Sequence, residues 1–260
     1  DELIGVTRNT EEEVYQLIKQ DFKAAAQSLP DTYGQGELGR ATKWAAIGLL
    51  SKVHMTLKEF DLANELLDQI INSNQFGLFA DYNKNFGEVN EHQMFPDING
   101  TLVNEIIWDV QFVKDERGGT ITQQTGSRDP QVGGVNGLWG GFENMLPTPE
   151  LRAMFESGDL RLDISYVEEV QLNGQTEVLE SNRTPDGGPI SGKYHNPENG
   201  ESPIRNNSGN NIIILRYADV LLLKAEALNE LGSTELAHQY INLVRERAGI
   251  SNLENLNQES

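Results

Sequence analysis

The sequence predicts a mainly α-helical protein in which helix pairs pack beside a loop-rich region with a few short strands. Three observations predict this fold class. Apolar residues recur at helical spacing near both ends of the chain, two helical stretches resemble each other, and a long middle segment is rich in Gly, Asn, Pro and Ser. A chain of 260 residues can bury its core without disulfides or metal ions.

The first predicted helix begins after Thr10. Glu13 follows three residues later, which is the spacing of a capping box, and Pro30 ends the helix. We expect the helix to bury one face against the rest of the protein, because its apolar residues fall on one side. These residues are Val14, Ile18, Phe22, Ala25 and Leu29.

Two predicted helix pairs share their internal spacing. The helices span residues 41–57 and 61–72 in the first pair, and 215–231 and 234–248 in the second. In each pair a small residue precedes an alanine by twelve positions: Ser51 and Ala63, then Ala225 and Ala237. Aligned on these residues, Ile47, Leu67 and Ile70 match Leu221, Ile241 and Val244. This is the pattern of a tetratricopeptide repeat, a helix–turn–helix unit of about 34 residues.

The middle segment between the pairs, residues 75–211, contains few predicted strands. Residues 104–113 alternate, with Ile106, Trp108, Val110 and Phe112 on the side predicted to be apolar. Weaker candidates are residues 166–172 and 212–215. Gly, Asn and Pro dominate elsewhere, and loops of this length inside a compact protein usually carry function.

Composition excludes several classes of partner and site. The formal net charge of −20 and the pI near 4.5 repel phosphate backbones, so we expect no nucleic acid partner. The chain has no cysteine, which excludes disulfides and thiolate metal sites. The first ten residues lack the basic and apolar blocks of a signal peptide, so we expect any export signal to lie upstream.

No catalytic or metal-binding motif is found, so we predict a protein that is not an enzyme and that holds no cofactor or metal. The four histidines never stand three or four residues apart. Asp81, Asn83 and Asn85 have the spacing of a calcium loop, but Phe86 and His92 stand where such a loop needs Gly and Glu. With 40 acidic residues, carboxylate pairs at glycosidase spacing arise by chance.

Five blocks of sequence resemble the SusD/RagB family. The segment 215–232 reads LRYADVLLLKAEALNELG and 240–249 reads YINLVRERAG, as in the signature helix pair of that family. Three further blocks stand in family order: residues 39–43 (GRATK), 104–108 (NEIIW), and 146–151 (LPTPEL) with Phe155 and the GDLR of residues 158–161. The resemblance implies a tetratricopeptide scaffold beside a variable part that carries a glycan site.

The resemblance also implies a location and partners. SusD-like proteins are surface-exposed lipoproteins of the outer membrane in Bacteroidetes, where they capture oligo- or polysaccharides for a SusC-like TonB-dependent transporter. Family members are about twice this length, so we expect a fragment that lacks the N-terminal part, with its lipid anchor, and the extreme C-terminal part. We expect one SusD-like domain in three parts: residues 1–74 and 212–260 tetratricopeptide-like, and 75–211 loop-rich and ligand-binding.

Aromatic residues indicate where a sugar could bind, because a sugar ring stacks its C–H face on an indole. Trp44 on a helix and Trp108 on a strand are interpreted as structural. Trp139 stands among glycines in a segment without periodicity, so it is either a ligand platform or an anchor of its loop. The candidate glycan-binding residues are Trp139, Asn136, Phe142, Glu143 and Arg128.

Two other functions stay open. One is an α-helical glycoside hydrolase or lyase, which paired acids beside an aromatic cleft would favour. The other is a tetratricopeptide adaptor for peptides, which a concave groove lined by Asn and Lys would favour, although the long middle segment argues against it. We also interpret Arg216, Lys224 and Glu226 as structural residues that tie the second helix pair to its neighbours.

Overall fold

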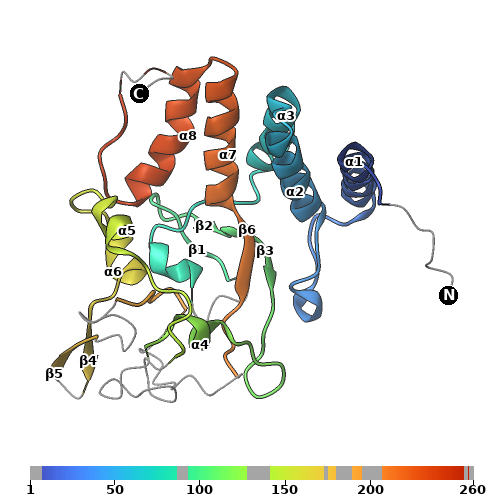
Figure 1. The fold of residues 1–260 in the computed structure, drawn as a ribbon. Helices are drawn as coiled ribbons and strands as arrows, with labels where there is room; N and C mark the ends of the chain where they lie inside the picture. The colour runs from blue at the N-terminus through green and yellow to red at the C-terminus, as the bar shows by residue number, and fades with distance from the viewer. Residues whose placement is uncertain are drawn as a thin grey trace.

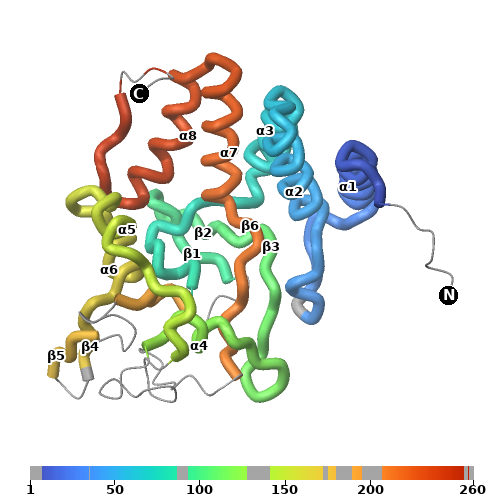
Figure 2. Tube along the Cα trace, viewed as in Figure 1, coloured from blue at the N-terminus to red at the C-terminus, as the bar shows by residue number. Residues whose placement is uncertain are grey.

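The computed structural model describes residues 8–86, 93–127, 141–172, 175–179, 189–194, 207–254 and 257. The fold is mainly α-helical, as predicted. Five long helices stand in a row, and shorter elements lie below and beside them (Figures 1 and 2). In the order of the row the long helices are α1 (Glu11–Ser28), α2 (Lys43–Thr56), α3 (Phe60–Asn72), α7 (Tyr217–Glu230) and α8 (Thr234–Arg247).

The two predicted helix pairs are confirmed, and they stack on each other although the middle segment separates them in sequence. The small residues at the crossings are all buried: Ser51, Ala63, Ala225 and Ala237. Helix α3 packs directly against α7, so the second pair continues the row of the first (Figure 1). The middle segment therefore loops out of a continuous helical scaffold.

The capping box of α1 is confirmed, because Thr10 accepts a hydrogen bond from the backbone of Glu13 and Glu13 accepts one from the backbone of Thr10. The apolar face predicted to be buried is only half-buried, at Ile18, Phe22 and Ala25. None of the described residues of α1 is buried, and Val14 is exposed. The helix stands at the outer end of the row and has only α2 as a close helical neighbour, so its apolar stripe is covered on one side only.

In the described part of the chain, the short elements outside the row of long helices form three two-stranded ribbons and several single turns. The ribbons pair β1 (Phe95–Pro96) with β2 (Leu102–Val103), β3 (Ile106–Val110) with β6 (Ile212–Arg216), and β4 (Glu169–Leu172) with β5 (Gln175–Val178), all antiparallel. The turns are the 3₁₀ helices η1 (Gln35–Glu37) and η2 (Tyr82–Asn85) and the short helices α4 (Ile121–Thr125), α5 (Pro149–Ala153) and α6 (Leu162–Ser165).

The strand predicted at residues 104–113 exists as β3, but its predicted apolar side is wrong. Irregular register on both sides of Trp108 breaks the alternation, so Ile106, Ile107 and Asp109 are all buried and Val110 is exposed. Trp108 is half-buried, and its indole Nε1–H donates to the carbonyl of Gly39 at 3.0 Å. Strand β3 thereby holds the turn before α2 in place.

The main core lies where α2, α3 and α7 meet the β3–β6 ribbon. Trp44 is buried there, which confirms its structural interpretation. Gly48 permits close contact between α2 and β6, because a Cβ at this position would lie 2.2 Å from Leu215 Cδ2. The buried residues of this core are Trp44, Ile47, Leu67, Ile70, Ile107, Leu215 and Val220.

Charged residues of α7 divide into two groups. Lys224 is buried, and its Nζ lies 2.6 Å from Oδ1 of Asp68 on α3, so it ties the two helix pairs together as predicted. Glu226 is exposed, and its carboxylate makes no hydrogen bond or ion pair with the described part of the chain. The structural interpretation of Glu226 is therefore wrong, because its position on α7 faces away from α3.

None of the helices formed by the described residues is both long and apolar enough to cross a membrane.

Candidate functional site

The stretch of residues 128–140, which contains the candidates Arg128, Asn136 and Trp139, has flanks that meet in the structure. Ser127 precedes it and Gly141 follows it, and the N–H of Gly141 donates to the carbonyl of Ser127 at 2.7 Å. Glu143 N–H donates to Gly126 O at 3.0 Å. The two flanks of the segment therefore lie side by side, and we call residues 126–127 and 141–143 the loop base.

The loop base is packed too closely for a side chain at Gly141. A Cβ on this residue would lie 2.4 Å from the Cα of Gly126, and backbone cannot yield as a side chain can. Glu143 has a positive φ of 53° and is only 2% exposed, and its Oε1 accepts a hydrogen bond from Ser127 Oγ at 3.3 Å. The hydrogen bond to this buried carboxylate joins the two flanks of the loop base.

The candidate residues divide between the loop base and the segment that it carries. Arg128, Asn136 and Trp139 lie outside the described residues. Phe142 is half-buried, and its N–H donates to the carbonyl of Gln123 on α4 at 2.6 Å. Glu143 faces the interior, which local sequence could not reveal because its partners depend on how the flanks meet.

A network of buried hydrogen bonds connects α4, which contacts the loop base, to the chain before β6. Thr122 Oγ1 on α4 donates to Ser208 Oγ at 2.7 Å and accepts from Asn210 Nδ2 at 3.1 Å. Asn210 Nδ2 also donates to the carbonyl of Tyr194 at 2.8 Å. Thr122, Ser208 and Asn210 are all buried, so α4 is held against the chain that leads into β6. The loop base is thus connected through α4 to the ribbon under the helical row.

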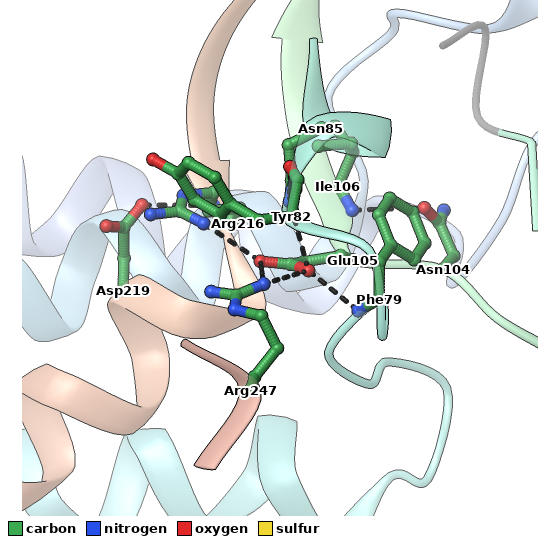
Figure 3. A network of polar contacts seen from close by, with 9 residues as sticks. All are labelled: Phe79, Tyr82, Asn85, Asn104, Glu105, Ile106, Arg216, Asp219 and Arg247. Carbon is green, nitrogen blue, oxygen red and sulfur yellow. Dashed lines mark hydrogen bonds and ion pairs between the residues drawn. The ribbon is translucent and has the colours of Figure 1, made fainter. Parts of the chain in front are cut away.

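A second cluster of polar residues lies deeper, around Glu105 (Figure 3). The side chain of Glu105 has no exposed surface, and it accepts hydrogen bonds from Arg216 at 2.9 Å and from Arg247 at 3.0 and 3.2 Å. The backbone N–H of Phe79 and the amide of Asn85 also donate to it, at 2.8 and 3.3 Å. Burial removes water from the Glu105 carboxylate. Five donor contacts replace that water and stabilise the negative charge.

The cluster around Glu105 brings together three of the sequence blocks that resemble the SusD/RagB family. Glu105, Arg216 and Arg247 stand in three of those blocks, and they join β3, the start of α7 and the end of α8. The Tyr82 ring lies 5.0 Å from the Arg247 guanidinium carbon. Burial lowers the pKa of Arg247, and the charge of Glu105 opposes that shift. The geometry supports a structural role, because side chains cover the carboxylate on all sides.

The residues with calcium-loop spacing have structural roles instead. Asp81 Oδ1 accepts from the backbone N–H of Asn83 at 3.0 Å and caps η2. Asn85 is buried and donates to Tyr82 O as well as to Glu105. Across the described ranges, His, Asp and Glu side chains form no group of three or more that could hold a metal ion.

A salt bridge of the GDLR block lies near the same cluster. Arg161 Nε and Nη2 donate to the two carboxylate oxygens of Asp159 at 2.9 and 2.6 Å, and the Asp159 side chain is 1% exposed. Burial raises the pKa of the Asp159 carboxyl, but the hydrogen bonds and the charge of Arg161 outweigh it, so this pKa lies below its ordinary value. Asp159 is therefore a carboxylate that Arg161 holds in place.

The stacked helix pairs, the looped-out middle segment and its anchored base define a helical-repeat scaffold that carries a large insert. Family models match both ends of the chain. Residues 1–55 match a family described as starch-binding associating with outer membrane. Residues 161–259 of the chain match the SusD family.

Relatives and solved structures agree with this assignment. The chain is 28% identical to the SusD-like protein P25 of Formosa agariphila, over 95% of the chain and 49% of the relative, and 25% identical to a SusD-like protein of Bacteroides ovatus, over 94% and 46%. The chain thus spans about half the length of the curated relatives that it matches.

Among solved structures, a SusD-like protein from Bacteroides fragilis has a TM-score of 0.78 at 24% identity, covering 97% of this chain and 56% of that one. The surface glycan-binding protein A from Bacteroides thetaiotaomicron, in complex with laminarihexaose, has a TM-score of 0.71 at 19% identity, covering 94% and 56%. At these identities the likeness shows the fold alone.

Proposed function

We propose that this chain is part of a non-catalytic glycan-binding protein of the cell surface. The match of residues 161–259 to the SusD family supports the proposal, as does the similarity in fold to proteins described as surface glycan-binding protein A and as a laminarin binding SusD-like protein. The single observation that carries it is the loop base. A rigid base under a segment rich in glycine, with one tryptophan, is suited to presenting an aromatic platform to a ligand.

The glycan site lies, in this proposal, on the segment that the loop base carries. Trp139 stacks against a sugar ring, while Asn136 and Arg128 meet hydroxyl groups. Phe142 and Glu143 stand at the base, where Phe142 is half-buried and Glu143 is hydrogen-bonded to Ser127. At the base, the C–H face of a sugar ring would contact Phe142, since Glu143 is nearly covered.

The partner of the whole protein is, in this proposal, a SusC-like TonB-dependent transporter in the outer membrane. The family description "associating with outer membrane" supports that location. A lipid anchor at the N-terminus of the mature protein would hold it there. The helical row is the surface we assign to the transporter, because stacked helix pairs offer a broad and rigid face.

A polysaccharide screen tests the binding function. The full chain is run in native gels that contain neutral plant, algal or host glycans or their acidic counterparts, and a bound glycan retards the band. Any glycan that binds is then incubated with the protein and assayed for new reducing ends or unsaturated products. Turnover above about 0.01 per second would show an enzyme instead. Failure to bind every glycan, with tight binding of peptides, would favour the adaptor function.

A further inference from the structure

A cavity of about 240 Å³ opens beside the Glu105 cluster, away from the loop base. It is smaller than the roughly 300–1,000 Å³ of sites for drug-sized ligands, so it suits one sugar unit or a substituent on it. Its walls combine aromatic, apolar and charged groups from η2, α5, α6 and the segment 189–194. The lining residues are Tyr82, Leu151, Met154, Phe155, Asp159, Arg161, Ser165 and Lys193.

The cavity has more hydrogen-bond donors than acceptors. Both carboxylate oxygens of Asp159 are occupied by Arg161. Four donors remain without a hydrogen bond to the described part of the chain: Oη of Tyr82, Nη1 of Arg161, Oγ of Ser165 and Nζ of Lys193. Donors that line a cavity without a partner favour a ligand that offers acceptor oxygens.

The charge around the cavity is positive, whereas the chain as a whole carries −20. Among the lining residues Arg161 and Lys193 are cationic and Asp159, which pairs with Arg161, is the carboxylate. Glu156 also acts electrostatically on Arg161, but it is paired with Arg245.

The Lys193 ammonium lies 5.9 Å from the ring centre of Tyr82 and 5.6 Å from that of Phe86, and it makes no ion pair with the described residues. An ammonium held against aromatic rings at the rim of a cavity attracts an anionic group.

Two more cationic side chains lie close to the ring of Tyr82, which forms part of the cavity wall. The guanidinium carbons of Arg216 and Arg247 are 5.7 and 5.0 Å from the ring centre of Tyr82, and the two share the carboxylate of Glu105. The Asp219 carboxylate accepts from the backbone N–H of Arg216 and adds a second negative group to that cluster (Figure 3). With the Glu156–Arg245 pair included, five cations and four carboxylates of the described residues surround the cavity and its back wall.

We propose that this cavity binds an anionic substituent of a saccharide, a carboxylate or a sulfate ester. The anionic group pairs with Lys193 and with the free edge of Arg161, Ser165 donates to it, and the sugar ring lies against Met154 and Phe155. Met154 is 79% exposed, so this apolar wall is open to a ligand. The proposal rests on the proposed function, because it names the class of glycan that the same protein captures.

The test compares three oligosaccharides by calorimetry on the full chain: a galacturonate hexamer, a sulfated galactose hexamer and neutral laminarihexaose. With Lys193→Gln, we expect the Kd for at least one acidic probe to rise about tenfold, since a hydrogen bond to a charged group contributes about 1.5–3 kcal/mol. Ser165→Ala should raise it about threefold. The acidic probe that responds identifies the group as a carboxylate or a sulfate.

The matched control is Lys84→Gln. Lys84 is exposed and lies 5.8 Å from the ring centre of Phe95, so this change removes the same charge from another aromatic ring outside the cavity. It should leave every Kd unchanged, and thermal melting should show both lysine variants folded. Binding of laminarihexaose without either acidic probe, or equal acidic affinity in Lys193→Gln, overturns the proposal and leaves glycan capture standing. Binding of no glycan at all overturns both.

Discussion

Arg247 Nη1 lies 3.0 Å from Oε2 and 3.2 Å from Oε1 of Glu105, although 142 residues separate the two in sequence. The side chains are 1% and 0% exposed. Glu105 begins the β3 region and Arg247 ends α8, so this pair closes the fold between the middle segment and the last helix. A buried pair need not stabilise a fold relative to apolar residues, but removing one partner leaves a charge without compensation.

Arg247→Met should therefore lower the free energy of unfolding by about 3 kcal/mol, because Glu105 would keep only Arg216 as a cationic partner. The control is Arg245→Met on the same helix. Arg245 pairs with Glu156, which is half exposed, so its loss should cost less than about 1 kcal/mol. Urea denaturation of both variants measures the difference. Equal losses would mean that the Glu105 pair contributes no more than a surface pair.

The pKa of Asp159 predicts how stability depends on pH. Its folded pKa lies below the ordinary 3.8, so the unfolded chain binds the proton more tightly. The stabilisation from Arg161 is complete above that ordinary value and is lost as the pH falls through the lowered folded pKa. Asp159→Asn should flatten this part of the profile of melting temperature between about pH 5 and pH 2. A variant whose profile parallels that of the unmodified chain would show that other carboxylates control acid unfolding.

Lys224 and Glu226 offer a test on a single helix. Lys224→Ala should lower the free energy of unfolding by about 2 kcal/mol, because it removes a buried side chain and its pair with Asp68. Glu226→Ala should change it by less than about 0.5 kcal/mol, because the residue is exposed and alanine favours a helix. Chemical denaturation measures both, and a larger loss in Glu226→Ala would contradict the structure.

Features that depend on nearby residues could be predicted from the sequence, whereas features that depend on distant contacts could not. The capping box at Thr10 and the small residues at the helix crossings follow from local spacing, and both are confirmed. The irregular register of β3 depends on its pairing with β6, so the alternating pattern misplaced Val110. The burial of Glu143 likewise depends on the meeting of two flanks across the segment that they enclose.

Gly141→Ala tests whether the loop base positions the candidate site. The added Cβ would lie 2.4 Å from the Gly126 backbone, so the two flanks must move apart. We expect glycan affinity to fall about tenfold, with a loss of about 1–3 kcal/mol in stability. The control is Gly36→Ala, where a Cβ meets nothing within 4 Å. Unchanged affinity in Gly141→Ala would separate the loop base from the glycan site.

Trp139→Ala distinguishes a ligand platform from a loop anchor. Loss of a stacked aromatic anchor commonly costs about 2 kcal/mol, so a platform predicts a Kd about thirtyfold higher for a bound glycan. Stability should then change little, because a side chain held by ligand leaves no cavity in the free protein.

An anchor packed on the scaffold predicts the reverse, a loss of several kcal/mol in stability with normal affinity of the folded fraction. Melting temperature and Kd are therefore measured on the same variant. The control is Trp108→Phe, which removes the hydrogen bond to Gly39 but keeps an aromatic ring on β3. It should lower stability by about 1 kcal/mol and leave the Kd unchanged, since Trp108 supports the turn before α2 and lies outside the loop base. An unstable Trp139→Ala variant that still binds normally when folded would remove Trp139 from the site.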